Sequence, residues 1–219
     1  MNYAQLVVAV SDYTENTFDT TDMNTFIQQA EQRIYNTVQF PSIRKNVTGT
    51  TTASNKYLSC PDDFLSVYSM AVINTDGSYE YLLNKDVNFI RQAYPTPTDT
   101  AIPKYYALFG PTVTGITISN ELSFILGPTP DTGYSVELHY YYYPESIVTA
   151  STTWLGDNFD SVLLYGTIVE AYTYMKGEAD IMTFYDGKYK EALALAKRLG
   201  DGMERQDAYR SGQFRQAVT

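Results

Sequence analysis

The sequence predicts an α+β fold in which helices from both ends of the chain form one bundle, with a mainly antiparallel β subdomain inserted between them. Apolar residues recur at helical spacing near the start of the chain and again near its end. Between these stretches, short runs rich in Val, Thr, Tyr and Phe are separated by turn signals, which is typical of strands. We therefore expect N-terminal helices in 1–43, the β subdomain in 44–150, C-terminal helices in 151–200 and an extended tail in 201–219.

The composition is that of a globular chain. Hydrophobic residues make up 44% and charged residues 18% of the 219 residues. A chain of this length buries enough surface to fold without disulfides or metals.

Two helices are expected in the N-terminal segment. The first, over Tyr3–Asp12, is short and amphipathic. The second begins after Asp22, whose carboxylate can cap it, and ends at about Gln39, before Pro41. The stripe expected to face the core comprises Met23, Phe26, Ile27, Ala30, Ile34 and Val38. The face expected to be left to solvent carries Glu31, Gln32, Arg33 and Asn36.

Turn signals organise the predicted strands. Asp76-Gly77 predicts a hairpin between 67–74 and 78–82, and Asn55-Lys56 punctuates another between 46–52 and 57–60. A short helix is expected over 85–94, because apolar residues recur there at helical spacing before Pro95. The remaining strands are expected at 104–109, 121–126 and 134–143.

Two further helices are expected after the β subdomain. A loop over 146–157 precedes the first, which Asp157 or Asn158 can cap and Gly177 ends. Its apolar residues cover more than one face, so we expect it to be the buried centre of the bundle. The last helix is expected over Ala179–Leu199, with Gly200 as its stop. Its buried stripe is expected to comprise Met182, Tyr185, Tyr189, Leu193, Ala196 and Leu199.

The sequence lacks the residue patterns that common catalytic and metal sites need. It holds one histidine, His139, and one cysteine, Cys60, whereas zinc sites need several such ligands. His139 lies in a strand pattern and is interpreted as a sheet residue, and Cys60 as a small buried side chain. Asp62 and Asp63 follow a proline and are interpreted as a turn or helix cap, and no phosphate-binding loop occurs. We therefore expect no enzyme activity and no cofactor.

Charge and hydropathy exclude two further classes. The net charge of −10 argues against a protein that grips nucleic acid through its phosphates. No run of about 18 apolar residues occurs, and no basic segment precedes the first apolar run. We therefore expect neither a membrane span nor a signal peptide.

Tyrosine is unusually frequent, with 21 residues against a single tryptophan. A tyrosine combines a large apolar body with a hydroxyl, so it suits strands whose outer face is wet or covered by another subunit. On a strand, the run Tyr140–Tyr143 would place two rings inward and two outward. Tyr140 and Tyr142 are candidate interface aromatics; alternatively, they stack sugars in a carbohydrate-binding or tail-associated receptor-binding module.

Seven stretches along the chain carry the most specific patterns: FIQQAEQRIYNTVQFPSIRKNVTG (26–49), LLNKDVNFIRQAYP (82–95), PKYYALF (103–109), FILGPTP (124–130), YYPESIV (142–148), WLGDNFDSVLLYGTIVEAYTYMKGEAD (154–180) and YKEALALAKRLGDG (189–202). In these stretches the chain resembles the head-to-tail adaptor proteins of tailed, podovirus-like phages. It departs from the family pattern in GPTVTGITISNE (110–121), which is longer than expected. That difference leaves the outline of the β subdomain open.

The resemblance implies a structural virion protein of the phage neck, made in the cytoplasm of the bacterial host. It implies a ring of about twelve copies beneath the portal protein, which joins the portal to the tail hub or nozzle protein. DNA is expected to pass through the channel without specific binding.

The tail over 201–219 is the expected portal-docking element. Arginine and aromatic residues contribute most of the binding energy at many interfaces. The tail carries five such residues, Arg205, Tyr209, Arg210, Phe214 and Arg215. The resemblance adds that adaptors of this type reach into the portal with terminal segments.

Overall fold

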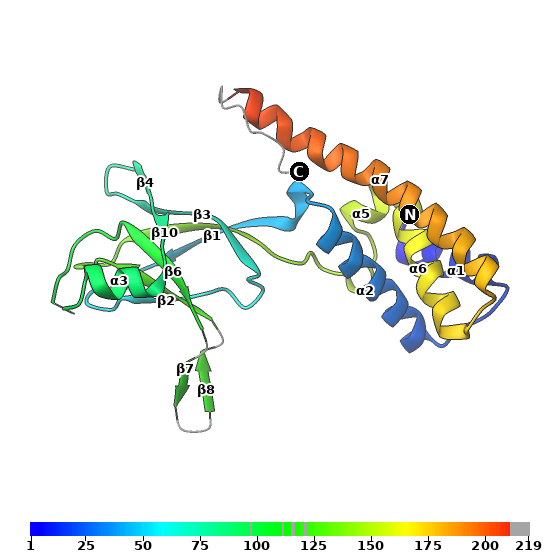
Figure 1. Cartoon of the computed structure of the whole chain (residues 1–219), viewed down its shortest axis with the longest axis horizontal. Coiled ribbons are helices and arrows are strands. Elements are labelled where there is room, and N and C mark those ends of the chain that lie inside the picture. The colour runs from blue at the N-terminus through cyan, green and yellow to red at the C-terminus, as the bar shows by residue number, and fades with distance from the viewer. Residues whose placement is uncertain (97, 111, 115–116, 121, 211–219) are drawn as a thin grey trace. The chain divides into compact units, whose positions relative to one another are not determined.

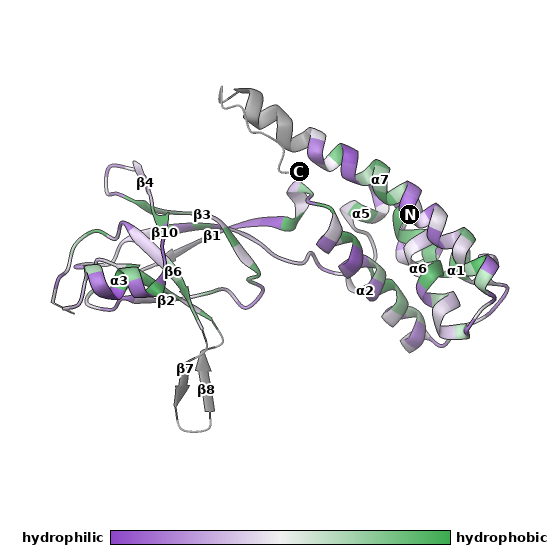
Figure 2. Cartoon of the chain, in the orientation of Figure 1, coloured by the Kyte–Doolittle hydropathy of each residue, from purple (hydrophilic) through white to green (hydrophobic). Residues whose placement is uncertain are grey.

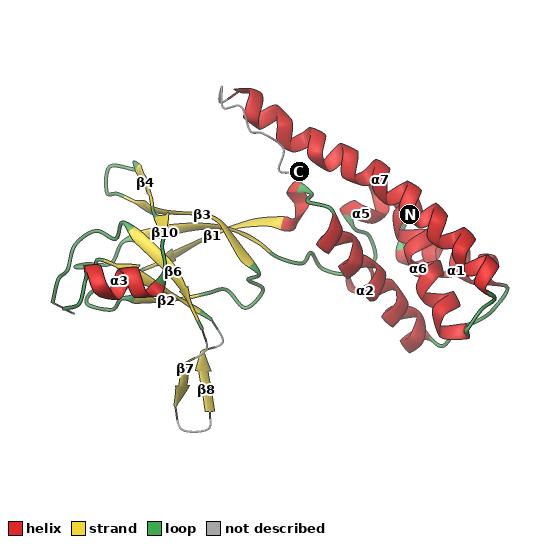
Figure 3. Ribbon diagram, in the orientation of Figure 1, coloured by secondary structure: helices red, strands yellow, loops and turns green. Residues whose placement is uncertain are grey.

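The computed structural model describes the backbone of residues 1–96, 98–110, 112–114, 117–120 and 122–210. It describes their side chains except those of 112–120 and 203–210. Two compact units make up the chain (Figure 1). The helical unit comprises Met1–Ile43 and Tyr143–Thr219, and the β unit comprises Arg44–Tyr142. The α+β class expected from the sequence is confirmed (Figure 3).

The helical unit is built around one central helix. Its elements are α1 (Tyr3–Thr14), α2 (Thr20–Thr37), the 3-10 helix η1 (Pro41–Ile43), α4 (Ile147–Ala150), α5 (Trp154–Asn158), α6 (Asp160–Met175) and α7 (Ala179–Arg210). Helix α6 packs against α1, α2, α5 and α7, and its buried residues lie on several faces. The expected buried centre of the bundle is therefore confirmed.

Helix α2 shows where the N-terminal expectations hold and where they fail. All six residues of its expected apolar stripe are buried, and the helix carries both green and purple turns in Figure 2. Its cap, however, is Asp19, whose carboxylate accepts a hydrogen bond from the N–H of Thr21; Asp22 lies in the first turn. Glu31, expected to face solvent, is buried, and Arg33 forms an ion pair with Glu170 of α6.

The C-terminal helices also differ from expectation at their ends. Residues 146–157, expected to be a loop, contain α4 and the start of α5. Helix α6 begins after Phe159, which makes no side-chain capping hydrogen bond, so neither Asp157 nor Asn158 caps it. Helix α7 passes through Gly200 and continues to Arg210, so residues 201–210 are helical rather than extended.

Gly200 is buried, because α7 packs closely at this position against residues 38–39. A Cβ built on Gly200 would lie 2.9 Å from the carbonyl oxygen of Gln39 and 3.2 Å from Cγ1 of Val38. This glycine therefore serves close packing beside η1 rather than helix termination. The neighbouring Leu199, expected in the buried stripe, is 50% exposed.

The β unit contains two four-stranded sheets, a short helix and a separate hairpin. Its elements are β1 (Arg44–Thr50), β2 (Tyr57–Ser59), β3 (Ser66–Ile73), β4 (Tyr79–Tyr81), β5 (Leu83–Asn84), α3 (Val87–Ala93), β6 (Tyr105–Phe109), β7 (Thr112–Thr114), β8 (Thr117–Asn120), β9 (Ser123–Gly127) and β10 (Ser135–Tyr141). The first sheet has the order β1-β10-β3-β4 and the second β2-β9-β6-β5. Among the described strands, β7 and β8 pair only with each other.

The core of the β unit lies between the two sheets. Met70 and Val72 of β3 and Leu138 of β10 pack there with Phe124 and Leu126 of β9. A smaller cluster, in which Ile90 of α3 meets Ala107 of β6 and Ile125 of β9, covers the other face of the second sheet. The order of layers is therefore sheet, sheet, helix.

One of the two expected hairpins exists. Strands β3 and β4 pair antiparallel across Asp76-Gly77, where Gly77 has φ +83°. The hairpin expected between 46–52 and 57–60 was wrong, because β1 pairs with β10 and β2 pairs with β9. After β1 the N–H of Thr51 donates to the carbonyl of Tyr134, and the chain then crosses to the second sheet.

Candidate docking site

The histidine and the cysteine, whose side chains are of types that can act in catalysis, pack against their neighbours in the β unit. His139 lies on β10 with its ring edge-on to Tyr68, the ring centroids 5.1 Å apart. Cys60 is half-buried beside the sheet core, and burial raises the pKa of its thiol to about 12, so the thiol stays protonated near neutral pH. Among the described residues, no three His, Cys, Asp or Glu side chains are grouped as metal ligands would be.

Asp63 anchors strands rather than capping a helix. Its carboxylate accepts hydrogen bonds from the Tyr140 hydroxyl and from Nζ of Lys45, each at 2.7 Å. The Lys45 bond, followed by the Tyr140 bond, lowers the pKa of Asp63. Burial, followed by the hydrogen bond to Asp63, raises the pKa of Tyr140 to about 12. One carboxylate therefore ties β1 and β10 to the segment between β2 and β3.

The structure removes Tyr140 from the candidate interface aromatics. Its side chain points to the same face of β10 as Val136 and Leu138, and it is 1% exposed. Its ring packs 5.9 Å from Phe64, centroid to centroid, inside the sheet core. Tyr142 is half-buried, and the Lys45 ammonium lies 5.2 Å from its ring centroid. A paired Tyr140–Tyr142 platform for a sugar is therefore not formed.

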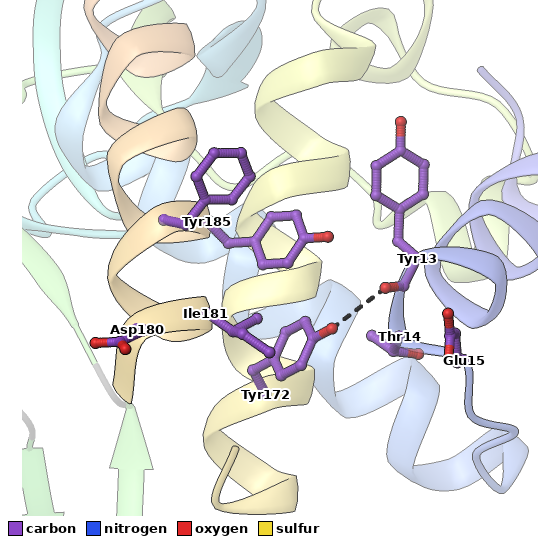
Figure 4. Close-up of a pocket in the computed structure, with 8 residues that line it drawn as sticks. Tyr13, Thr14, Glu15, Tyr172, Asp180, Ile181 and Tyr185 are labelled. Carbon is purple, nitrogen blue, oxygen red and sulfur yellow. Dashed lines mark hydrogen bonds between the residues drawn. The ribbon is translucent and has the colours of Figure 1, made fainter. Parts of the chain in front are cut away.

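A groove with an aromatic lining opens on the helical unit, at the ends of α1 and α6 and the start of α7 (Figure 4). Its volume is about 520 Å³. Tyr172 and Tyr185 stack on its floor with ring centroids 5.2 Å apart. The Tyr172 hydroxyl donates to the backbone carbonyl of Tyr13 at 3.2 Å, which joins α6 to α1. We call this the aromatic groove; it is lined by Tyr13, Thr14, Glu15, Tyr172, Asp180, Ile181, Phe184 and Tyr185.

The lining combines exposed apolar side chains with carboxylates. Phe184 is 59% and Tyr13 45% exposed, and Glu15 and Asp180 lie among them. Four exposed apolar residues of α7, the α7 stripe, comprise the pair Ile181 and Phe184 and the pair Leu195 and Leu199, with the exposed Lys188 and Glu191 between the two pairs. Their spacing places them on one side of the helix. Exposed apolar surface of this kind suits contact with another protein.

Sequence reasoning missed the aromatic groove and the α7 stripe. The groove is assembled from three helices, and no local pattern reports that assembly. The stripe did have a signal, because Ile181, Phe184 and Leu195 follow helical spacing beside the residues expected to be buried.

The predicted docking residues of the tail fall at the edge of the described chain. Arg205, Tyr209 and Arg210 lie on the helical backbone of α7, and their side chains are outside the description. Phe214 and Arg215 lie outside the described residues. No helix of the described chain combines the length and hydrophobicity required to cross a lipid bilayer.

The exposed apolar residues of the aromatic groove and the α7 stripe favour a protein that acts through contacts with other chains. A family model described as SU10 adaptor protein matches residues 1–216. The chain therefore belongs to this family of phage head-to-tail adaptors. No curated protein matches the chain.

Proposed function

We propose that this chain is a structural, non-enzymatic protein of the phage neck whose copies form a ring of about twelve between the portal and the tail hub or nozzle. Membership of a phage adaptor family supports a place among the virion components. The aromatic groove and the α7 stripe supply exposed apolar area for such contacts. The protein is made in the host cytoplasm and is retained in the virion.

The observation that carries the portal-docking part of the proposal is the length of α7. It has 32 residues, whereas α6, on which it packs, has 16. Gly200 holds α7 beside Gln39, and the helix then continues from Asp201 to Arg210 (Figure 1). A rigid helix anchored at Gly200 presents its end at lower entropic cost than a free tail would.

In this proposal Arg205, Tyr209, Arg210, Phe214 and Arg215 dock on the portal. Arginines pair with portal carboxylates or carbonyls, and the two aromatic rings fill pockets. The net charge of −10 disfavours phosphate contacts, so DNA passes through the ring without being held.

A truncation tests the docking role. Ending the chain after Gly202 removes all five residues but keeps Gly200 and its contact with Gln39. We expect the truncated chain to keep the thermal unfolding midpoint of the full chain and to lose binding to portal-bearing heads.

A matched full-length control separates the side chains from the length of the helix. Tyr209→Ala combined with Phe214→Ala should weaken loading, whereas Gln213→Ala should not. Loading of the truncated chain equal to that of the full chain would show that the tail is not the docking element.

A further inference from the structure

The edges of the two four-stranded sheets differ greatly in length. Among the described strands, the outermost are β1 with seven residues, β2 and β4 with three each, and β5 with two. An antiparallel edge strand directs about half of its N–H and C=O groups away from its neighbour. Strand β1 therefore offers a long, open row of backbone donors and acceptors.

Strand β1 has few of the features that prevent an edge strand from pairing with another chain. Its pairing with β10 runs from Arg44 to Thr50 without a bulge, and it contains no proline. Residues 45–50 are all exposed, and after Lys45 the strand carries no charge. Lys45 is engaged by Asp63. Such an edge is an acceptor for an added strand.

The β7–β8 hairpin is the strand pair that lacks a sheet. It is inserted between β6 and β9, and neither of its strands pairs with a four-stranded sheet (Figure 1). A two-stranded ribbon is marginally stable in water unless something packs on it or extends it. Residues 112–120 contain no charged residue and are rich in Thr, Val and Ile, which favour strands.

The outer edge of β7 fits the role of donor better than that of β8. In the β7–β8 ladder Thr112 pairs with Asn120 and Val113 with Ile118, so Ser119 is an extra residue on β8. Irregularities of this kind twist an edge away from further pairing. Strand β7, over Thr112–Thr114, carries no extra residue, and β8 is its one ladder partner among the described strands.

We propose that β7 of one copy pairs with β1 of the neighbouring copy and adds a fifth strand to that copy's first sheet. The inference rests on the proposed ring, and names its interface. Each copy carries the edge and the hairpin at different places, so the contact is head-to-tail, and repeating it with a fixed rotation closes a ring. Main-chain hydrogen bonds hold the contact.

A trimmed variant tests the donor. Because Phe109 is the ladder partner of Ser123, the same register places Gly110 opposite Leu122. Residues 111–121 can then be replaced by an Asn-Gly turn. Leu122 is kept because its carbonyl accepts the N–H of Cys60. We expect a folded chain that has lost ring assembly in a native mass measurement.

Engineered disulfides test the pairing without trimming. In a Cys60→Ala background, Val113→Cys is combined with one cysteine at a time on β1, namely Asn46→Cys, Val47→Cys, Thr48→Cys or Gly49→Cys. These positions sample both faces of β1, because alternate residues face opposite sides. At least one pair should give a ladder of covalent oligomers under mild oxidation, whereas each single variant should give dimers at most.

The outcomes separate this inference from the proposed function. A wild-type ring with an equally assembled trimmed variant and no covalent ladder would overturn the β7–β1 contact and leave the adaptor role standing. A wild-type chain that stays monomeric, alone and with portal, would contradict the proposed ring and this interface with it. Slow amide exchange over 45–50 in the ring, lost on trimming, would support the contact.

Discussion

Glu31 is a buried carboxylate on α2 whose oxygen accepts the backbone N–H of Ile147 at 2.9 Å. It therefore satisfies a donor at the start of α4. Burial raises its pKa above the usual value of 4.5, against the opposing effect of the hydrogen bonds from Ile147 and Ser146. Because the folded pKa is the higher one, the stabilising contribution of Glu31 is complete below pH 4.5 and falls as pH rises through the folded pKa.

We expect Glu31→Gln to gain stability relative to the wild type as pH rises, because the amide oxygen keeps the hydrogen bond and carries no charge. Glu31→Leu should cost about 1–3 kcal/mol at neutral pH, since it leaves the Ile147 N–H without its partner. Urea unfolding at acidic and neutral pH measures both. A constant difference between the Gln variant and the wild type at every pH would contradict the account.

The Tyr140 hydroxyl makes a second long-range bond, to Asp63 at 2.7 Å. We expect Tyr140→Phe to cost about 1 kcal/mol, because Asp63 is partly exposed and water can replace the hydroxyl. Tyr142→Phe is the matched control, as the Tyr142 hydroxyl makes no hydrogen bond to any described residue. Equal unfolding midpoints for the two variants in urea would show that the Asp63 bond adds no stability.

Residue-scale partners of this kind could not be predicted from the sequence. Glu31 and Ile147 are 116 residues apart, and a carboxylate on a helix normally faces water. Tyr140 lies on the inner face because the side of β10 that carries Val136, Leu138 and Tyr140 faces the core between the two sheets. The tyrosine run predicted the alternation of faces but not which rings turn inward.

At the scale of elements, Gly200 and Gly202 form a matched pair within α7. Alanine normally stabilises a helix by about 1 kcal/mol relative to glycine. Gly202→Ala should show this gain, because nothing lies within 4 Å of a Cβ there. Gly200→Ala should lose stability, because its Cβ would meet the Gln39 carbonyl at 2.9 Å. Thermal unfolding compares them, and an equal rise in midpoint would mean that α7 does not pack closely on residues 38–39.

The elements with a strong local signal were predicted well. Helical spacing identified the buried stripe of α2, and Asp76-Gly77 identified the β3–β4 turn. The hairpin expected over 46–60 failed because β1 forms a seven-residue ladder with β10, a pairing that local turn chemistry does not report. The sequence does not distinguish a close backbone approach from a C-terminal cap at Gly200, because both favour glycine.

At the scale of the whole molecule, the helices–strands–helices order predicted the α+β class, and the resemblance in seven stretches along the chain agrees with the family match over residues 1–216. Surfaces were harder to predict than the fold. The aromatic groove combines Tyr13 with Tyr172 and Tyr185 from distant parts of the chain. The open edge of β1 depends on the strand order of a sheet, which alternation does not fix.

The central claim is that the chain works as a ring that joins the portal to the tail. Native mass measurement of the full chain, alone and mixed with the portal of the same virus, tests it most directly. We expect a closed species of about twelve copies of the 24.7 kDa chain, formed alone or on the portal, and its stable complex with the portal. A single 24.7 kDa species under both conditions would contradict the claim.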